Sequence, residues 1–191
     1  MSHFFAYISK MKWIKRWGLM KNTAEENIME HSWQVATIAH GLATIKNDVF
    51  GANVDAEHIA MLALYHETGE VITGDFATPV KYFNPEIKNA IGDLEHLAKE
   101  KIFSMLPTEL QKSYQPLIFP DEKGEEYIIV KAADKICAYL KCIEELKWGN
   151  REFSKAEKTI RSDLEKMDRE EVQYFLEHFL ESFSLTLDEL N

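Results

Sequence analysis

One stretch of the chain decides the fold: Ile59-Ala60-Met61-Leu62-Ala63-Leu64-Tyr65-His66-Glu67-Thr68-Gly69-Glu70-Val71-Ile72-Thr73-Gly74-Asp75. Its first six residues are apolar on most sides of a helix, which predicts a buried helix. The run leads directly into His66 and Glu67, whose burial costs free energy unless the groups are paired or bind a metal. We therefore interpret the stretch as part of a functional site and expect other segments to supply partners for these two residues.

Outward from this stretch, the spacing of apolar residues predicts helices. Asp55 is a good N-cap for the helix that carries the stretch, and Asn84 followed by Pro85 should start another. Asp168 with Glu171 has the form of a capping box. We expect helices over residues 2–16, 55–74, 29–46, 85–106, 123–148, 153–167 and 169–183, and a short helix that begins at Pro107 and ends before Pro116.

Residues 75–84 are rich in aromatic side chains but hold no helical repeat. Pro79 would interrupt a helix, so we expect an apolar loop that lies in a cleft or over it. No alternation of apolar and polar residues is longer than four positions, and no internal repeat is present. The prediction is therefore one all-α domain that spans residues 1–191.

The composition limits the classes of partner. The 191 residues carry a formal net charge of −10, which argues against binding to nucleic acid polymers or to anionic membranes. The first 23 residues nevertheless hold five basic side chains and no acidic one. Such a local basic segment suits a small anion held at one point, or it is simply a solvated helix face.

Cys137 and Cys142 are the only cysteines and are too few for a disulfide framework. Free buried thiols fit the reducing cytoplasm. The N-terminal residues lack the charged and apolar regions of a signal peptide, and no apolar run is long enough to cross a membrane. We expect a cytoplasmic protein without a membrane anchor.

Four residues on three predicted helices are candidate metal ligands: His31, His66, Glu67 and Asp134. Imidazole and carboxylate together bind divalent first-row metals and leave positions open for water and substrate. A bound metal lowers the pKa of water to near neutrality and polarises a phosphoryl oxygen. Each residue also has an ordinary interpretation: His31 as a core or exposed histidine, and Asp134 as a hydrogen-bonded structural acid.

The order of these residues resembles the HD-domain metal-dependent phosphohydrolases, an all-α helical-bundle family with H…HD…D ligands. The likeness extends to Ser2–Ala6, Lys15–Met20, Glu30–Ser32, Thr73–Asn84, Lys131–Asp134, Ala138–Cys142 and the Ser-Leu-Thr-Leu-Asp-Glu-Leu ending. These segments are similar to the YfbR-type bacterial 5′-deoxyribonucleotidases. The resemblance covers almost the whole chain, and the Thr-Gly-Asp-x-x-Thr-Pro-Val-Lys-Tyr-Phe-Asn segment is its most specific part.

The resemblance implies hydrolysis of deoxyribonucleoside 5′-monophosphates, a homodimer and a divalent metal, with Co, Mn, Zn, Fe and Mg not distinguished. It implies ligation by His31, His66 and Asp134, with Glu67 where the family has the Asp of its HD pair. It also implies further roles: Glu70 near the attacking water, Asp75 near the sugar and its leaving oxygen, Arg16 on the phosphate, Trp17 on the sugar to exclude a ribose 2′-OH, and Thr78 and Lys81 lining the pocket.

Physical chemistry supports several of these roles and leaves alternatives. An arginine fork donates two parallel hydrogen bonds to a phosphate, which suits Arg16. Glu70 falls on the same side as His66 and Glu67 if their helix continues. The alternatives are a solvated carboxylate for Glu70, packing for Trp17, a solvated amine for Lys81, and a turn cap for Asp75.

Glu67 is the one departure from the family pattern. Its side chain is one methylene longer than Asp, an overshoot of about 1.5 Å, whereas ligand distances tolerate about 0.2 Å. Three outcomes are open: Glu67 still binds metal, it drops out of the ligand set, or the site loses its metal. We expect ligation to be retained. The alternatives to a deoxyribonucleotidase are an HD phosphohydrolase acting on another nucleotide and a catalytically impaired nucleotide-binding protein.

Overall fold

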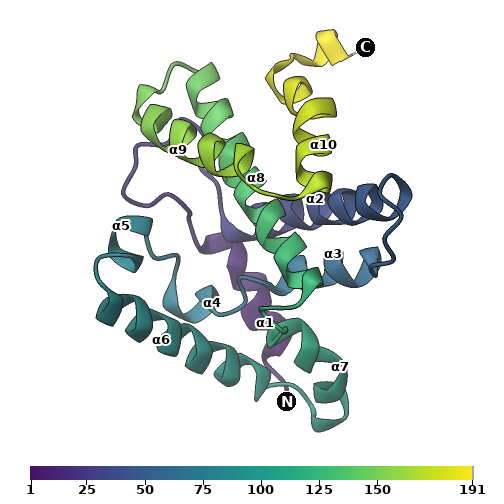
Figure 1. Cartoon of the computed structure of the whole chain (residues 1–191). Helices are drawn as coiled ribbons and strands as arrows, with labels where there is room; N and C mark the ends of the chain where they lie inside the picture. Colours follow the sequence, from purple (N-terminus) through teal and green to yellow (C-terminus); the bar gives the residue numbers. More distant parts are fainter. Residues whose placement is uncertain (191) are drawn as a thin grey trace.

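The computed structural model describes residues 1–190 and is built from helices alone (Figure 1). In chain order these are α1 (Phe4–Ile8), η1 (Ser9–Trp13), α2 (Ile28–Asp48), α3 (Ala56–Tyr65), α4 (Glu70–Thr73), α5 (Thr78–Lys81), α6 (Pro85–Phe103), α7 (Thr108–Ile118), α8 (Glu125–Lys147), η2 (Arg151–Phe153), α9 (Ser154–Glu165), α10 (Glu170–His178), η3 (Leu180–Ser184) and η4 (Leu187–Leu190). Within these residues the only β-type pairing is an isolated bridge between Lys15 and Asn27. The predicted all-α class is confirmed, and one domain over 1–191 stays a prediction.

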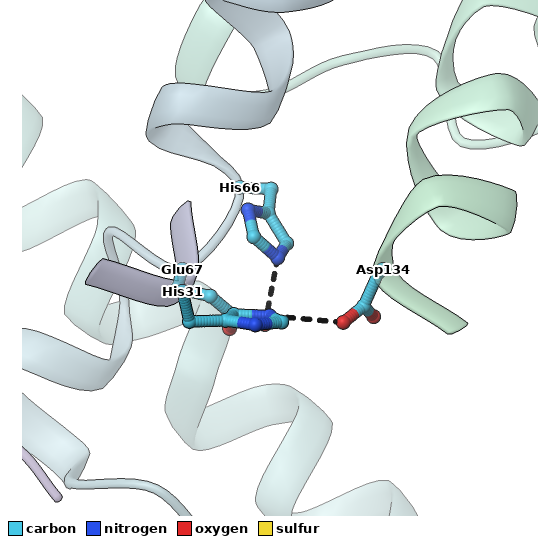
Figure 2. A group of neighbouring side chains, drawn as sticks. All are labelled: His31, His66, Glu67 and Asp134. Carbon is cyan, nitrogen blue, oxygen red and sulfur yellow. Dashed lines mark hydrogen bonds and ion pairs between the residues drawn. The ribbon is translucent and has the colours of Figure 1, made fainter. Parts of the chain in front are cut away.

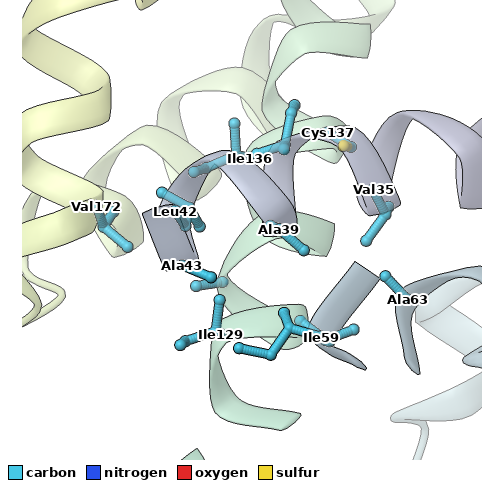
Figure 3. Close-up of a cluster of buried hydrophobic side chains, with 14 of the residues drawn as sticks. Val35, Ala39, Leu42, Ala43, Ile59, Ala63, Ile129, Ile136, Cys137 and Val172 are labelled. Atoms are coloured by element: carbon cyan, nitrogen blue, oxygen red, sulfur yellow. The ribbon is translucent and has the colours of Figure 1, made fainter. Parts of the chain in front are cut away.

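The main core lies where α2, α3 and α8 pack together, with α10 against one side (Figure 3). Its members share near-complete burial and include Val35, Ala39, Leu42, Ile59, Ala63, Ile129, Ile136 and Val172. The alanines let the helix backbones approach closely, and the larger aliphatic side chains fill the space between them. This packing fixes the relative positions of α2, α3 and α8, and those helices carry or lead into every candidate metal ligand.

A second, smaller core holds α1 against α6 and α7. Phe4, Ile102, Leu106 and Ile118 are buried there. The backbone of α6 also approaches the segment after α3 closely, since a Cβ added to Gly69 would lie 3.1 Å from the carbonyl oxygen of Glu95. This second core therefore supports α6 as a backing for the turn that carries Glu67 and Glu70.

The predicted continuous helix over 55–74 is wrong, because α3 ends at Tyr65 and α4 begins only at Glu70. Side chains compete for the carbonyl groups of the last turn. The Thr68 hydroxyl donates to the Tyr65 carbonyl at 2.7 Å, and His66 Nδ1 lies 2.6 Å from the Ala63 carbonyl oxygen. Gly74 ends α4 with φ of 73°, a left-handed conformation that glycine adopts without strain.

The N-terminal helix is also shorter than predicted. Regular α-helix covers only Phe4–Ile8, and the 3₁₀ segment that follows ends at Trp13 rather than at residue 16. Ile14 is extended, and the backbone of the next residues pairs with the segment before α2: the Arg16 N–H donates to the Glu26 carbonyl, and the Ile28 N–H to the Ile14 carbonyl. Long-range pairing thus overrides the local helical pattern.

Two prolines and one capping residue differ from prediction. Pro79 lies in the first turn of the short helix α5, where a missing N–H removes no helical bond. Pro116 lies inside α7, which continues to Ile118. Asp168 does not cap α10, which begins at Glu170 and is followed after His178 by a separate 3₁₀ segment. Glu171 instead accepts from Arg169 Nε at 2.6 Å.

The remaining helix boundaries agree with prediction to within about three residues, which is the usual spread at helix ends. The predicted caps Asp55 and Asn84 both accept backbone N–H bonds. Cys137 and Cys142 are free and buried. Among the described residues, none of the helices has the length and apolar character needed to cross a membrane.

Candidate metal centre

The four predicted ligands, far apart in the sequence, meet in one cluster (Figure 2). His31 comes from the first turn of α2, His66 and Glu67 follow α3 directly, and Asp134 lies in the middle of α8. One ligand atom from each residue can be chosen so that all lie within 4.8 Å of one another. This convergence is the arrangement that a single bound cation requires.

His66 shows how the cluster fits a cation. Its Nδ1 lies 2.6 Å from the Ala63 carbonyl oxygen, which can only accept, so Nδ1 carries a hydrogen. The other ring nitrogen, Nε2, is buried without a hydrogen-bond partner and lies 3.0 Å from Glu67 Oε1. In the neutral ring this nitrogen presents a lone pair beside a carboxylate oxygen, and a divalent cation would satisfy both.

His31 and Asp134 form the other half of the cluster. His31 Nε2 lies 3.0 Å from Asp134 Oδ1 (Figure 2). Burial lowers the pKa of His31 to about 4, although Asp134 opposes the shift, so the imidazole is neutral near pH 7. Burial raises the pKa of Asp134, but the hydrogen bond with His31 and the charge of Lys131 outweigh it and hold the pKa below its ordinary value. A neutral imidazole and a charged carboxylate are the states in which these groups bind metals.

The extra methylene of Glu67 does not carry its carboxylate out of the cluster. Its Oε1 lies 3.0 Å from His66 Nε2, and the residue is a member of the group of four. Two imidazoles and two carboxylates form a donor set that suits a divalent transition metal. The residues present therefore fit the metal that the sequence predicts.

Glu70 and Asp75 lie beside the cluster, but the backbone that carries Glu70 there is not the continuous helix that the sequence predicted. The turn over residues 66–69, rather than one continuous helix, brings Glu70 next to Glu67. Burial, then the charges of Glu67 and Asp75, raise the pKa of Glu70 to about 10, so Glu70 holds a proton that it shares with Glu67. Burial also raises the pKa of Asp75, whereas Arg16 opposes that shift.

Arg16 and Trp17 reach the cluster from the segment between η1 and α2. The Nη1 atom of Arg16 contacts His31 Nδ1 and lies 3.1 Å from Glu26 Oε2. The Trp17 indole N–H donates to the same Glu26 oxygen at 3.1 Å. Sequence reasoning missed Glu26, whose one visible signal was an acid directly before the N-cap Asn27 and five positions before His31.

Thr78 and Lys81 lie on the short helix α5, which leads away from Asp75 toward α6. Thr78 is exposed at the start of α5. Lys81 Nζ donates to Glu95 Oε1 of α6 at 2.7 Å, and its side chain is 31% exposed, so the amine is paired as well as partly solvated. The charges of Glu67 and Glu70 are also among the influences that raise the pKa of Lys81, after burial, which lowers it, and Glu95. Lys81 therefore faces the acidic side of the cluster while it ties α5 to α6.

Comparison with known proteins finds relatives along the whole chain. Residues 3–183 match the family model described as 5′-deoxynucleotidase YfbR-like. The chain is 50% identical over 192 residues to a 5′-deoxynucleotidase of Photorhabdus laumondii, covering 100% of this chain and 98% of that protein. It is 51% identical over 193 residues to the 5′-deoxynucleotidase YfbR of Escherichia coli, covering 100% and 96%.

A solved structure extends the comparison to the fold. The HD-domain phosphohydrolase of Listeria innocua superposes with a TM-score of 0.83 at 25% sequence identity, over 95% of this chain and 88% of that one. The resemblance predicted from sequence motifs is thereby confirmed. With a family match over nearly the full length, half of all positions identical to curated members and the same helical fold, the chain belongs to the YfbR-like 5′-deoxynucleotidase family.

Proposed function

We propose that this protein is a metal-dependent phosphomonoester hydrolase that converts deoxyribonucleoside 5′-monophosphates to deoxynucleoside and phosphate. The observation that carries the proposal is the group of four ligand atoms within 4.8 Å of one another, with the guanidinium of Arg16 in contact with one of its members. Phosphoryl transfer depends mainly on positioning and on neutralising the phosphate charge. A cation site beside an arginine provides both.

His31, His66, Glu67 and Asp134 would hold the divalent metal. When bound, the metal supplies a water of near-neutral pKa and a Lewis acid for a phosphoryl oxygen. Two imidazoles among the donors favour zinc or iron over magnesium and manganese, which prefer oxygen ligands. The close approach of Glu67 to His66 supports retained ligation by the longer side chain.

Arg16 would bind the phosphate through two N–H groups of its planar fork. Water attacks the phosphorus, the bond from phosphorus to the 5′-oxygen breaks, and two protons move. Glu70 would accept the proton of the attacking water, since added positive charge in the cluster opposes the rise in its pKa that burial, Glu67 and Asp75 cause. Asp75, whose pKa burial raises, would donate a proton to the leaving 5′-oxygen.

Trp17 would pack against the sugar and exclude a ribose 2′-OH, and Thr78 and Lys81 would line the pocket. A side chain in van der Waals contact with C2′ leaves no room for an added oxygen. The roles of Trp17 and Lys81 rest on their bonds to Glu26 and Glu95 and on the family likeness, and the role of Thr78 rests on the family likeness alone.

The decisive experiment is a phosphate-release screen of the purified protein with each dNMP and NMP, in Co²⁺, Mn²⁺, Zn²⁺, Fe²⁺ and Mg²⁺. We expect release from dNMPs in at least one transition metal and release from NMPs that is slower by a factor of about a hundred. Equal turnover of ribonucleotides would favour the phosphohydrolase of a different nucleotide. Binding of dNMP without release in any metal would favour the impaired nucleotide-binding protein.

We also propose one domain over residues 1–191, a homodimer and a cytoplasmic location. The two free buried thiols support the location. Exposed apolar side chains along α5, the following turn and α6 support a partner surface, namely Val80, Tyr82, Phe83, Ile87, Leu94 and Leu97. Light scattering after size-exclusion chromatography tests the dimer, and a monomer at micromolar concentration would contradict it.

A further inference from the structure

We propose that Glu26 is a positioning residue that holds Arg16 and Trp17 in the geometry used for substrate binding. The inference rests on the proposed function for its consequence in catalysis, but not for its geometry. A single carboxylate oxygen, Glu26 Oε2, lies 3.1 Å from Arg16 Nη1 and 3.1 Å from Trp17 Nε1. The Arg16 and Glu26 side chains are only 15% and 13% exposed, so solvent competes weakly for these bonds.

The backbone of Trp17 gives an independent reason why such a restraint is needed. Trp17 is the one non-glycine residue with a positive φ among residues 1–190, and its value is 59°. An aromatic residue adopts this left-handed conformation only where its surroundings enforce it. Several contacts do so. The indole N–H bonds Glu26, and the ring packs on Phe153 with 5.3 Å between ring centroids. The Trp17 carbonyl accepts from Asn22 Nδ2 at 3.3 Å and from the Met20 N–H at 2.9 Å.

The main chain brings Glu26 to its place without help from its side chain. The Arg16 N–H donates to the Glu26 carbonyl at 2.9 Å, next to the bridge between Lys15 and Asn27. Farther along the loop, the N–H groups of Thr23 and Ala24 donate to the buried carboxylate of Glu145 on α8. The loop backbone is thus held by the bridge that joins its two ends and by Glu145 between them, so the Glu26 side chain is available to bind Arg16 and Trp17.

Glu26 also connects this pair to the metal cluster. Its second oxygen, Oε1, lies 4.0 Å from His31 Nδ1, and Arg16 contacts the same nitrogen. The guanidinium carries five N–H donors, so Nη1 can remain on Glu26 while other donors face a phosphate. Fixing one edge of the fork reduces the conformational freedom that Arg16 loses when a phosphate binds. Fixing the indole sets how close its ring comes to the sugar.

The test compares Glu26→Gln with Glu25→Gln as a matched control. Glu25 is the neighbouring residue, bonds only the exposed Lys15 at 2.6 Å, and has a side chain that is 71% exposed. For Glu26→Gln we expect KM for dNMPs to rise about tenfold or more with kcat changed less than threefold, and the dNMP-to-NMP preference to fall about tenfold. For Glu25→Gln we expect both quantities to stay within twofold of wild type.

A readout separate from catalysis is the indole N–H signal of Trp17 in a ¹H–¹⁵N spectrum, assigned by its loss in Trp17→Phe. Loss of the charged acceptor in Glu26→Gln should move this signal upfield and leave the other three tryptophans in place. Glu26→Asp keeps the charge but withdraws the carboxylate by about 1.5 Å, so it should resemble Glu26→Gln. In the Trp17→Phe background, Glu26→Gln should no longer change the dNMP-to-NMP preference.

An unmoved indole signal in a folded Glu26→Gln protein would overturn the inference, as would KM and preference that match the Glu25→Gln control. Circular dichroism melts establish folding, and Glu26→Asp serves if Glu26→Gln unfolds. If the wild-type protein hydrolyses no dNMP, the proposed function fails instead. The inference then stands or falls on the indole signal and on dAMP affinity measured by calorimetry, which should drop about tenfold in Glu26→Gln.

Discussion

The candidate site combines two regions that differ in how the chain supports them. His31 and Asp134 project from α2 and α8, two long helices that pack into the main core. Glu67, Glu70 and Asp75 lie instead on a turn, a four-residue helix and the residue after Gly74. The first region is held by buried apolar area, and the second by a few side-chain bonds and by the backing of α6.

This difference separates two tasks. The helical region supplies ligands whose positions the core determines, so they need little local support. The turn region places several acidic groups close together, since the charges of Glu67 and Asp75 both act on Glu70. Bonds such as that of Thr68 to the Tyr65 carbonyl stabilise it locally. We therefore expect substitutions of His31 or Asp134 to act by weakening metal binding. Substitutions in the turn region should act by displacing the acidic groups.

The largest expected effect is that of Asp134→Asn. Loss of the charged ligand that pairs with His31 should abolish metal retention and reduce dNMP hydrolysis by about a thousandfold or more, with the fold intact. Metal content after dialysis and phosphate release measure the two effects. The matched control is Asp163→Asn, which removes an exposed carboxylate paired with Lys135 and should change neither. Full metal content in Asp134→Asn would show that the helical region does not hold the ion.

The next largest effect concerns the stability of the loop that carries Arg16. Glu145 is buried and accepts bonds from Thr23, Ala24, Asn150 and Lys141. Although burial raises its pKa, these bonds, first that of Lys141 and then that of Asn150, lower it to about 2. A lowered pKa stabilises the fold above the ordinary pKa of about 4.5 and is lost as the pH falls toward 2.

Glu145→Gln should therefore reduce the free energy of unfolding by about 3 kcal/mol at pH 7, and by much less below pH 3. Urea melts of both proteins between pH 2.5 and 7 measure the difference. Glu144→Gln, the neighbouring exposed acid, is the control and should show no such pH dependence. A constant difference at all pH values would mean that packing rather than charge gives Glu145 its effect.

What the sequence could predict differs between the same two regions of the site. The predicted bounds of α2, α6 and α8 lie within about three residues of the observed ones, because apolar spacing and capping residues determine these helices locally. His31, His66, Glu67 and Asp134 were identified from residue type and family order, and the structure brings them together. Asp134 lies well inside the long helix α8, so an error of two residues at an end of that helix does not displace it.

The turn region and the loop before α2 were not predictable in the same way. The break after Tyr65 depends on which side chains take the carbonyl groups of Ala63 and Tyr65, and the helical pattern of Ile59–Leu64 gives no signal of it. Glu26 acquires its role only when the Lys15–Asn27 bridge folds the loop back beside Arg16. Such roles arise from non-local contacts that a linear pattern does not contain.

Gly74→Ala tests whether the turn region depends on its backbone geometry. An alanine at φ of 73° and ψ of 166° is strained, because almost only glycine adopts this conformation, and the strain should cost about 1–3 kcal/mol of stability and move Asp75. We expect kcat to fall about tenfold with metal content unchanged. The control is Gly92→Ala inside α6, where a Cβ meets nothing within 4 Å and should stabilise the helix slightly. Wild-type kcat in Gly74→Ala would show that Asp75 tolerates a relaxed turn.

Lys81→Met should have the smallest effect. The Lys81–Glu95 ion pair joins α5 to α6 with side chains 31% and 23% exposed, so its loss should cost less than about 1 kcal/mol.

The same lysine adds positive charge on the acidic side of the cluster, so KM for dNMPs should rise about two- to fivefold at low salt and less at high salt. Glu95→Gln removes the ion pair but keeps that charge, and it should leave KM at or below the wild-type value. If both variants raise KM equally, the helix contact matters and the charge does not. A tenfold fall in kcat for Lys81→Met would instead show that Lys81 contributes to the chemical step. The turn region that supports catalysis would then reach from α4 to the end of α5.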